Sequence, residues 1–293
     1  MSFAAVPVLA LAVTVSSQAS ATGHSPAATH VSAAALAAAR AAIERDFTAD
    51  TGPAAAGSRL QHRDGPAAVV ASAFWAGYVA KNTGGDVYTQ VTGNWIQPAI
   101  KCNPNETELA VFWVGLDGYT STPVEQTGSL AECFKGAISY YTWWQMFPDA
   151  PTIVGATVKA GDNITATVTF AGGNFNLTVN DATTAGNNIN TNQACPAGVA
   201  GGCPRSSAEW VAEAPSGGRG YYPLPNFTAW TLNAGTATSN LRVNQPIGAF
   251  PNDQLTLTAV NPPGQAAGTY PLAPTGALNA GGNSFITTWT GSY

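Results

Sequence analysis

Histidine, charge and long apolar runs are scarce in this 293-residue sequence. The three histidines, His24, His30 and His62, all lie in a leading part that we expect to be absent from the mature protein. A mature chain without histidine cannot activate a serine or cysteine nucleophile through an imidazole, and it lacks the usual ligands of catalytic metals. We therefore expect no metal and no cofactor. Any catalysis has to use carboxylates, amides, hydroxyls or lysine.

Charged residues make up only 9% of the chain. From residue 70 onward there are four lysines, three arginines and twelve acidic residues. A surface built from Thr, Asn, Ser and Gln gains little net charge as the pH falls, so acid generates less self-repulsion than in an ordinary protein. A net charge of -5 also argues against a basic face that binds nucleic acid.

The first 69 residues differ in kind from the rest of the chain. The apolar run at residues 3–15 is too short to span a bilayer, and Ala19-Ser20-Ala21 has the form of a signal-peptidase site. We expect residues 1–21 to be a signal peptide, so that the mature protein is secreted and has no membrane contact. Residues 22–69 begin with an Ala-rich part that favours helix and continue with a part rich in Gly and Pro. This composition is typical either of a cleavable pro-segment or of a disordered leader.

Residues 70–293 are dense in Val, Thr, Trp, Tyr and Phe, with turn residues at short intervals. This pattern, without a long helical period, is typical of an all-β domain, and roughly 224 residues fit one sandwich or barrel. A hairpin is expected at residues 112–128, with its turn at Gly115–Gly118. Further strands are expected at residues 74–79, 87–96, 138–147, 152–158, 163–170, 174–180, 206–214, 227–232, 239–245, 254–260 and 284–290, with a long loop at 183–205 and a turn residue at Asp253.

Four cysteines lie in this domain. After a secretion signal they predict disulfides, and their spacings are not those of a zinc site. Proximity in sequence favours Cys102 with Cys133 and Cys195 with Cys203, although four cysteines allow three pairings.

Two of the expected strands carry polar groups among apolar ones. Alternation places Glu209, Val211 and Glu213 on one face of the strand at residues 206–214. An unpaired buried charge is costly, so each acid should have a partner or a raised pKa, unless this is a solvent-facing edge strand. In the strand at residues 138–147, one face is either sandwich core or the floor of a groove for an extended substrate; it carries Ser139, Tyr141, Trp143, Gln145 and Phe147.

Two separated motifs together resemble the glutamic peptidases, the eqolisin family. They are Trp113-Val114-Gly115-Leu116-Asp117-Gly118 with Gln126-Thr127-Gly128, and Ala208-Glu209-Trp210-Val211 with Glu213. Trp75-Ala76-Gly77 and Trp143-Trp144 with Phe147-Pro148 fall in the family's order, so the resemblance covers most of residues 74–214. It implies a secreted acid endopeptidase with a pro-segment, built as a concanavalin-like or jelly-roll sandwich of two antiparallel sheets. We expect a monomer whose partners are polypeptide substrates.

The family's catalytic glutamine falls on Gln126 and its catalytic glutamate on Glu209, while Trp113 and Asp117 match residues that line the same cleft. A carboxylate can take a proton from water and return it to the leaving amine, and an amide N–H can stabilise the oxyanion. We also expect Trp143, Gln145 and Phe147 to bind substrate. Three positions depart from fungal members, which carry Asn, Glu and Tyr where this chain has Phe74, Gln145 and Phe147, so the pH range of activity stays open.

Two other functions suit a concanavalin-like sandwich. A glycoside hydrolase would use two carboxylates, but Glu209 and Glu213 are about 13 Å apart along a strand, so Asp117 or Glu125 would have to serve. A carbohydrate-binding module would use Trp143 or Trp144 as a platform.

Overall fold

The computed structural model describes residues 68–155, 157–217, 220–261 and 265–292, together with Ala34, Ala37, Ala38 and Ala41. All described residues belong to one compact unit, Val31–Tyr293. The expected signal peptide and most of the expected pro-segment lie outside the described residues. The four alanines are helical, in the segment where a helix was expected.

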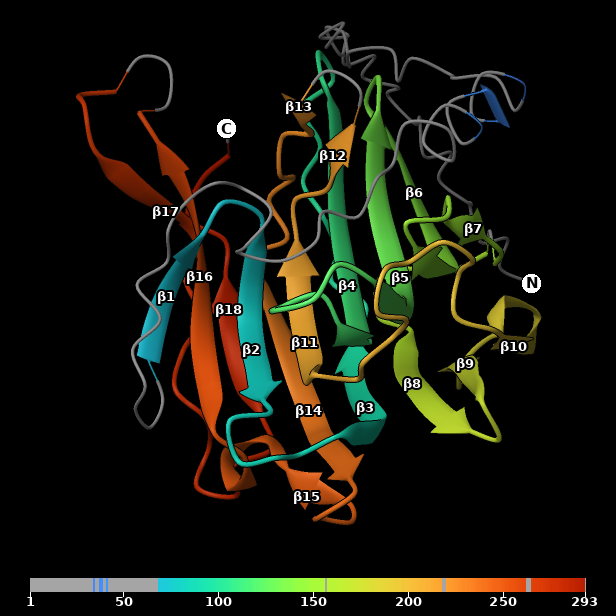
Figure 1. Cartoon of the computed structure of the whole chain (residues 1–293). Helices are drawn as coiled ribbons and strands as arrows, with labels where there is room; N and C mark the ends of the chain where they lie inside the picture. The colour runs from blue at the N-terminus through green and yellow to red at the C-terminus, as the bar shows by residue number, and fades with distance from the viewer. Residues whose placement is uncertain are drawn as a thin grey trace, which may run out of the picture. The chain divides into compact units, whose positions relative to one another are not determined.

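The larger of two main sheets has nine strands in the described part of the chain (Figure 1). Its strands pair antiparallel except β1 with β16, which run parallel. In spatial order they are β1 (Ala68–Ser72), β16 (Asn252–Val260), β2 (Trp75–Lys81), β11 (Ser207–Glu213), β4 (Thr107–Asp117), β5 (Val124–Phe134), β6 (Ala137–Phe147) and β7 (Thr152–Ile153), with β17 (Thr269–Ala273) also on β16.

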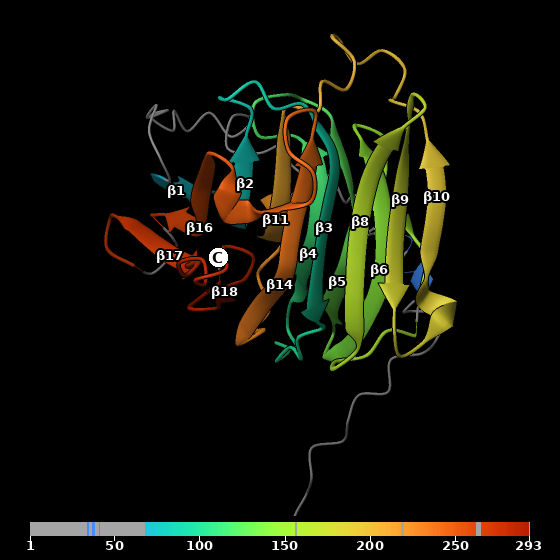
Figure 2. The same cartoon turned by 90° about the horizontal axis from the view of Figure 1, so that it is seen from below.

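The second sheet has seven antiparallel strands and forms the other layer of the sandwich (Figure 2). In order they are β10 (Ile189–Gln193), β9 (Asn174–Asp181), β8 (Asn163–Ala171), β3 (Tyr88–Ile96), β14 (Ala229–Ser239) and β15 (Gln245–Pro246), with β18 (Phe285–Thr288) also on β14. The smaller elements are the ladder of β12 (Ser216–Gly217) with β13 (Gly220–Tyr221) and the 3-10 helices η1 (Ala185–Asn187) and η2 (Ile247–Ala249). Within the ranges given above, no helix has the length and apolar character needed to cross a bilayer.

Large aromatic rings fill the space between the two sheets. Trp230 packs edge-on against Trp95 at a centroid distance of 5.8 Å and contacts the tilted ring of Phe112 at 5.6 Å. The indole of Trp210 donates a hydrogen bond of 2.7 Å to the carbonyl of Thr92 in the opposite sheet. Apolar burial and this cross-sheet bond together fix β11 against the seven-stranded sheet.

The nine-stranded sheet also buries side chains on its other face. Alternation along its strands sends one set of residues into the inter-sheet core and the other into a second apolar cluster. In this second cluster Trp75 and Trp113 pack edge to face, with centroids 5.0 Å apart. We call this side of the sheet the outer face; among its buried apolar residues are Val79, Val111, Trp143, Val211 and Leu255.

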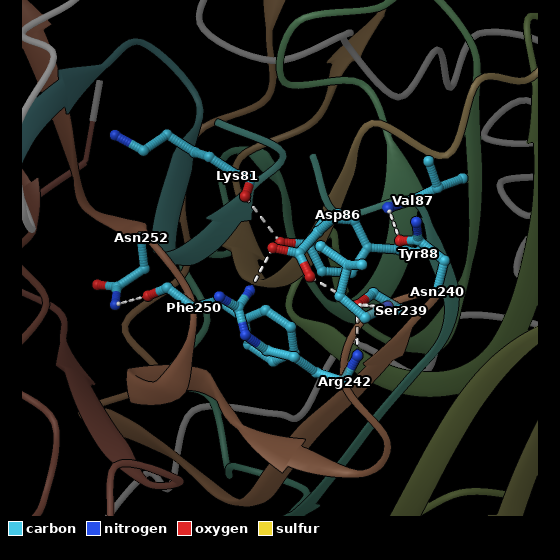
Figure 3. A network of polar contacts seen from close by, with 10 residues as sticks. Lys81, Asp86, Val87, Tyr88, Ser239, Asn240, Arg242, Phe250 and Asn252 are labelled. Atoms are coloured by element: carbon cyan, nitrogen blue, oxygen red, sulfur yellow. Dashed lines mark hydrogen bonds and ion pairs between the residues drawn. The ribbon is translucent and has the colours of Figure 1, made fainter. Parts of the chain in front are cut away.

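A polar network closes one end of the sandwich (Figure 3). The fully buried Asp86 accepts a hydrogen bond of 2.6 Å from Ser239 and is ion-paired with Arg242. The Tyr88 hydroxyl donates to the carbonyl of Lys81, the last residue of β2, at 2.9 Å. The end of β2 is thereby tied to the seven-stranded sheet, which keeps β2 in register beside β11.

Several element boundaries differ from the sequence prediction. Gly115 lies within β4, paired on both sides, and the turn comes later, where Asp117 (φ 68°) and Gly118 (φ 95°) are left-handed. Of the strand expected at residues 239–245, only Ser239 and Gln245 are in strands, at the end of β14 and the start of β15. Residues 240–244 form a turn, in which the Ser239 hydroxyl accepts the N–H groups of residues 241 and 242. Only residues 152–153 of the strand expected at 152–158 pair, and β10 lies inside the expected loop at 183–205.

The structure contains both disulfides that proximity favoured, Cys102–Cys133 and Cys195–Cys203. Glu108 lies beside the first of them, close enough for the three side chains to resemble a metal-binding group. Because both sulfurs are in a disulfide, neither is a thiolate ligand. The first disulfide ties the loop before β4 to the end of β5.

Candidate active site

Glu209, Gln126 and Gln145 lie in one row across the nine-stranded sheet. Glu209 of β11 is opposite Gly115 of β4, Gly115 is opposite Gln126 of β5, and Gln126 is opposite Gln145 of β6. Directly opposed residues of an antiparallel sheet point to the same face. The three side chains therefore share the outer face with the Trp75 cluster, as alternation predicted for Glu209.

Gly115 stands between Glu209 and Gln126 in this row and has no side chain. Since neighbouring strands lie about 4.8 Å apart, the Cα atoms of Glu209 and Gln126 are separated by roughly 10 Å. A Cβ atom at position 115 would lie 2.8 Å from the Trp113 ring and 3.2 Å from the Cβ of Gln126. Gly115 thus adds no side chain of its own between Glu209 and Gln126, and the Trp113 ring of the same strand lies close beside it.

Glu209 is fully buried, and burial raises the pKa of its carboxyl group well above the usual 4.5. The Ser207 hydroxyl on the same face lowers this pKa in part, while the charges of Asp117 and Glu125 raise it further. Neither carboxyl oxygen has a partner at full hydrogen-bond geometry within the described ranges. Buried polar groups in native proteins are normally paired, so an uncommitted carboxyl group of this kind points to a functional role.

Gln126 is also fully buried, but only one end of its amide is bonded. Its Nε2 donates to Oε1 of Gln145 at 2.9 Å, and Nε2 of Gln145 donates to the carbonyl of Asp149 at 2.8 Å. Oε1 of Gln126 has no partner among the described residues. The row therefore carries unpaired acceptors on both sides of Gly115, on Glu209 and on Gln126.

Asp117 is committed to the backbone of the segment that leads into β11. Its carboxylate accepts the N–H groups of Arg205 and Ser206, each at 2.7 Å, and the hydroxyls of Ser206 and Ser121 at 2.9 and 3.0 Å. The resemblance implied that Asp117 lines the substrate cleft, which stays a prediction. In the structure its contacts fix the start of the strand that carries Glu209.

The aromatic residues expected to bind substrate share the outer face, but they differ in exposure. Trp113 and Trp143 are fully buried, and the Trp113 indole donates to the carboxylate of Glu213 at 2.6 Å. Phe147, at the end of β6, is partly exposed. A fully buried Trp143 does not suit a carbohydrate platform.

An ion pair that the sequence reasoning missed lies on the same face. Lys81 is paired with Asp253 at 2.7 Å, and the Tyr119 hydroxyl donates to the other oxygen of Asp253, also at 2.7 Å. Asp253 is a buried residue of β16, so its prediction as a turn residue is wrong. The alternation of Asp253 with the apolar Leu255 could have indicated a strand, but the preceding Pro251 and Asn252 favoured a turn.

Glu125 points away from Gln126, into the space between the two sheets. It is opposite Leu116 and Met146, which belong to the inter-sheet core. Burial raises its pKa well above 4.5, and the neighbouring Asp117 carboxylate adds to the rise. Glu125 and Glu209 therefore do not face each other across one substrate, which disfavours the pair of acids required by a glycoside hydrolase.

Comparison with known proteins identifies a family for most of the described chain. Residues 73–259 match the Peptidase A4 family. No curated protein sequence matches the chain. Among solved structures, the crystal structure of aspergilloglutamic peptidase from Aspergillus niger is similar, with 26% sequence identity and a TM-score of 0.49 over 62% of this chain and 99% of that chain.

Proposed function

Because the chain belongs to the peptidase A4 family and is a glutamic-type peptidase, we propose that Glu209 and Gln126 form the catalytic pair of this endopeptidase. The observation that carries the proposal is the pair of unpaired, buried acceptor groups on either side of Gly115. A water molecule has two hydrogens to donate, so one held above Gly115 would satisfy both groups. It would also stand beside the base that must activate it.

The proposed reaction starts with Glu209 in its ionised form. Glu209 takes a proton from the water as the water oxygen attacks the carbonyl carbon of the substrate peptide bond. The second Nε2 hydrogen of Gln126 donates to the oxygen on which negative charge develops, a contribution typically worth about 3–4 kcal/mol. Glu209 then returns the proton to the leaving amine, which breaks the C–N bond and restores the carboxylate.

The raised pKa of Glu209 sets the direction of the pH dependence. A general base must be unprotonated, so kcat/KM should rise with pH through the Glu209 pKa and reach its plateau above the ordinary value of 4.5. We propose that the enzyme acts on the acid side of neutrality, as the resemblance to the glutamic peptidases implies. The scarcity of surface charge supports activity under these conditions, because the folded chain gains little self-repulsion in acid.

We further propose that the protein is secreted as a precursor and acts as a monomer on polypeptides. The expected cleavage between residues 69 and 70 falls within β1, which pairs with β16 from residue 68 onward. N-terminal sequencing of precursor incubated in acid tests this part of the proposal. A product that begins close to residue 68 would keep the whole of β1.

The test of the pair is casein digestion by Glu209→Gln and Gln126→Ala, measured from pH 3 to pH 7 with pepstatin present. We expect kcat/KM to fall by about 10²–10⁴-fold for Glu209→Gln and about 10²–10³-fold for Gln126→Ala. Glu132→Gln, which changes another buried acid on the same face but outside the row, is the matched control and should keep most of the activity at acid pH. A folded Glu209→Gln protein with unchanged activity would refute the proposed mechanism.

A further inference from the structure

We propose that Gln145 is a positioning residue that fixes which end of the Gln126 amide faces Glu209. The inference rests on the proposed function, because the orientation matters only if Gln126 takes part in the reaction. It assigns to Gln145 a part in preparing Gln126 rather than the substrate contact expected from the sequence. The observations that support it are two hydrogen bonds that run from the turn after β6 to the centre of the row.

The direction of these two bonds follows from the backbone. The carbonyl oxygen of Asp149 can only accept a hydrogen bond, so Gln145 must present its Nε2 there. Its Oε1 is then the end that faces Gln126, and an oxygen can only accept. Gln126 must therefore turn its Nε2 toward Gln145, which leaves its Oε1 for a water molecule beside Glu209.

The same two bonds disfavour the flipped amide of Gln126. A rotation by 180° would bring Oε1 of Gln126 against Oε1 of Gln145, and two acceptors at hydrogen-bond distance repel each other. Both side chains are almost fully buried, so solvent cannot compensate for the lost bond. The site is thus prepared with one acceptor for the water and one free N–H for the substrate oxygen.

The turn that supplies the Asp149 carbonyl is itself held by the backbone. The N–H of Asp149 donates to the carbonyl of Met146 at 2.9 Å, which folds the chain back toward the end of β6. Neither Gln145 nor Gln126 titrates, so the orientation should not depend on pH. Among the titratable residues, Glu209 and Glu213 of β11, Glu132 of β5 and Tyr141 of β6 have outer-face positions, Asp117 ends β4, and Asp149 lies in the turn after β6.

A carboxyl group at position 145 distinguishes this role from simple packing. In Gln145→Glu the protonated side chain can still donate to the Asp149 carbonyl and accept from Gln126. Once ionised, the carboxylate has only acceptor oxygens, so it repels the carbonyl of Asp149 instead of donating to it. The side chain at position 145 is then no longer held in place as the acceptor for Nε2 of Gln126. The ratio of kcat for Gln145→Glu to kcat for the unmodified enzyme should therefore fall by ~10-fold or more as the pH rises from 3 to 7, with little change in KM.

Two further variants complete the experiment. Gln145→Met fills the same space without hydrogen bonds and should lower kcat by a similar factor at every pH, so that its ratio is flat. Gln90→Glu introduces the same charge on β3 of the other sheet, where Gln90 bonds to Thr169, and should leave the ratio near one. Melting curves recorded at each pH confirm that the compared proteins are folded.

The outcomes separate this inference from the proposed function. A flat ratio for Gln145→Glu, or a folded Gln145→Met with unchanged kcat, would overturn the positioning role even if Glu209→Gln is inactive. An active Glu209→Gln would instead refute the catalytic pair. A falling ratio for Gln145→Glu together with a constant loss in Gln145→Met is the result that supports the proposal.

Discussion

At the scale of single residues, Gly115 is the position of the site that least tolerates a larger side chain. It is the point of the row at which two functional side chains must approach each other across an intervening strand. In Gly115→Ala the new methyl group would meet the Trp113 ring at 2.8 Å and push against the Cβ of Gln126 at 3.2 Å. We expect kcat/KM to fall by ~10²-fold, with a loss of about 1–3 kcal/mol of stability from overpacking.

Enzyme assays and urea denaturation of Gly115→Ala measure these two effects. Gly186→Ala is the control, because a Cβ at that position meets no atom within 4 Å and its backbone is not left-handed. The control should change neither activity nor stability by much. Wild-type kcat/KM in Gly115→Ala would show that Glu209 and Gln126 do not act together above this residue.

The sequence predicted which face of the sheet carries Glu209 and Gln145, but it did not predict the hydrogen bonds of Gln145 and Asp117. Strict alternation in β11 and β6 placed Glu209 beside Val211, and Gln145 beside Trp143 and Phe147, as the structure has them. The bonds of Gln145 depend on a turn that brings a backbone carbonyl back to the strand end, and no sequence period encodes such a contact. The same holds for Asp117, whose backbone partners Arg205 and Ser206 follow it by more than 80 residues.

At the scale of elements, Asp117 connects the β4–β5 hairpin to the start of β11. Asp117→Ala removes the acceptor for two backbone N–H groups and leaves a residue with a β-carbon, but without a polar side chain, in a left-handed conformation. We expect a loss of about 2–5 kcal/mol from the unpaired groups and a lower kcat, since Glu209 lies on the strand thus released. Urea denaturation and peptidase assays measure both.

Comparing Asp117→Asn with Asp117→Ala tests whether the hydrogen bonds of Asp117 hold β11. Asparagine tolerates the left-handed backbone and keeps one acceptor oxygen, so it should recover roughly half of the lost stability. Equal stability of the Asn and Ala variants would mean that the hydrogen bonds of Asp117 do not hold β11. Equal stability of Ala and the unmodified protein would contradict the account of this connection altogether.

The extent of most strands was also predictable, and the errors have physical causes. Gly115 favoured a turn in the sequence, but pairing with both β11 and β5 keeps it extended. Threonine and valine favoured a strand at residues 152–158. There Thr142 and Asn187 instead take up the backbone N–H groups of residues 155 and 157. In both cases, hydrogen bonds to residues distant in the sequence overrode the conformation that the local residue types favour.

At the scale of the whole molecule, composition predicted the all-β class, because strand-forming residues and short turns recur through residues 70–293. The resemblance to the glutamic peptidases implied the sandwich of two sheets that the structure has. Neither could predict which face of the nine-stranded sheet carries the site. That face is defined by the packing of the second sheet, whose formation depends on pairing strands as distant in the sequence as β3 and β14. The burial of several acids is a further property that only the assembled fold reveals.

These buried acids determine how stability should depend on pH. Burial raises the pKa of Glu132 from 4.5 to about 7, against a lowering by the hydroxyl of Tyr141, and it raises the pKa values of Glu125 and Glu209 as well. Between pH 4.5 and 7 the folded protein keeps protons that the unfolded chain has released. The free energy of unfolding should therefore be highest below pH 4.5 and fall as the pH rises, with Glu132 alone contributing roughly 3 kcal/mol of the fall.

Glu132→Gln isolates that contribution. Because glutamine does not titrate, the variant should lose less stability than the unmodified protein between pH 4 and pH 8, by roughly the 3 kcal/mol assigned to Glu132. Its remaining pH dependence should come mainly from Glu125 and Glu209, whose pKa values are shifted in the same direction. Urea denaturation at each pH gives both curves. If the free energy of unfolding falls equally steeply with pH in both proteins, Glu132 is already ionised in the folded state. A less steep fall in Glu132→Gln would show that buried carboxyl groups of the sheet make the folded protein more stable in acid.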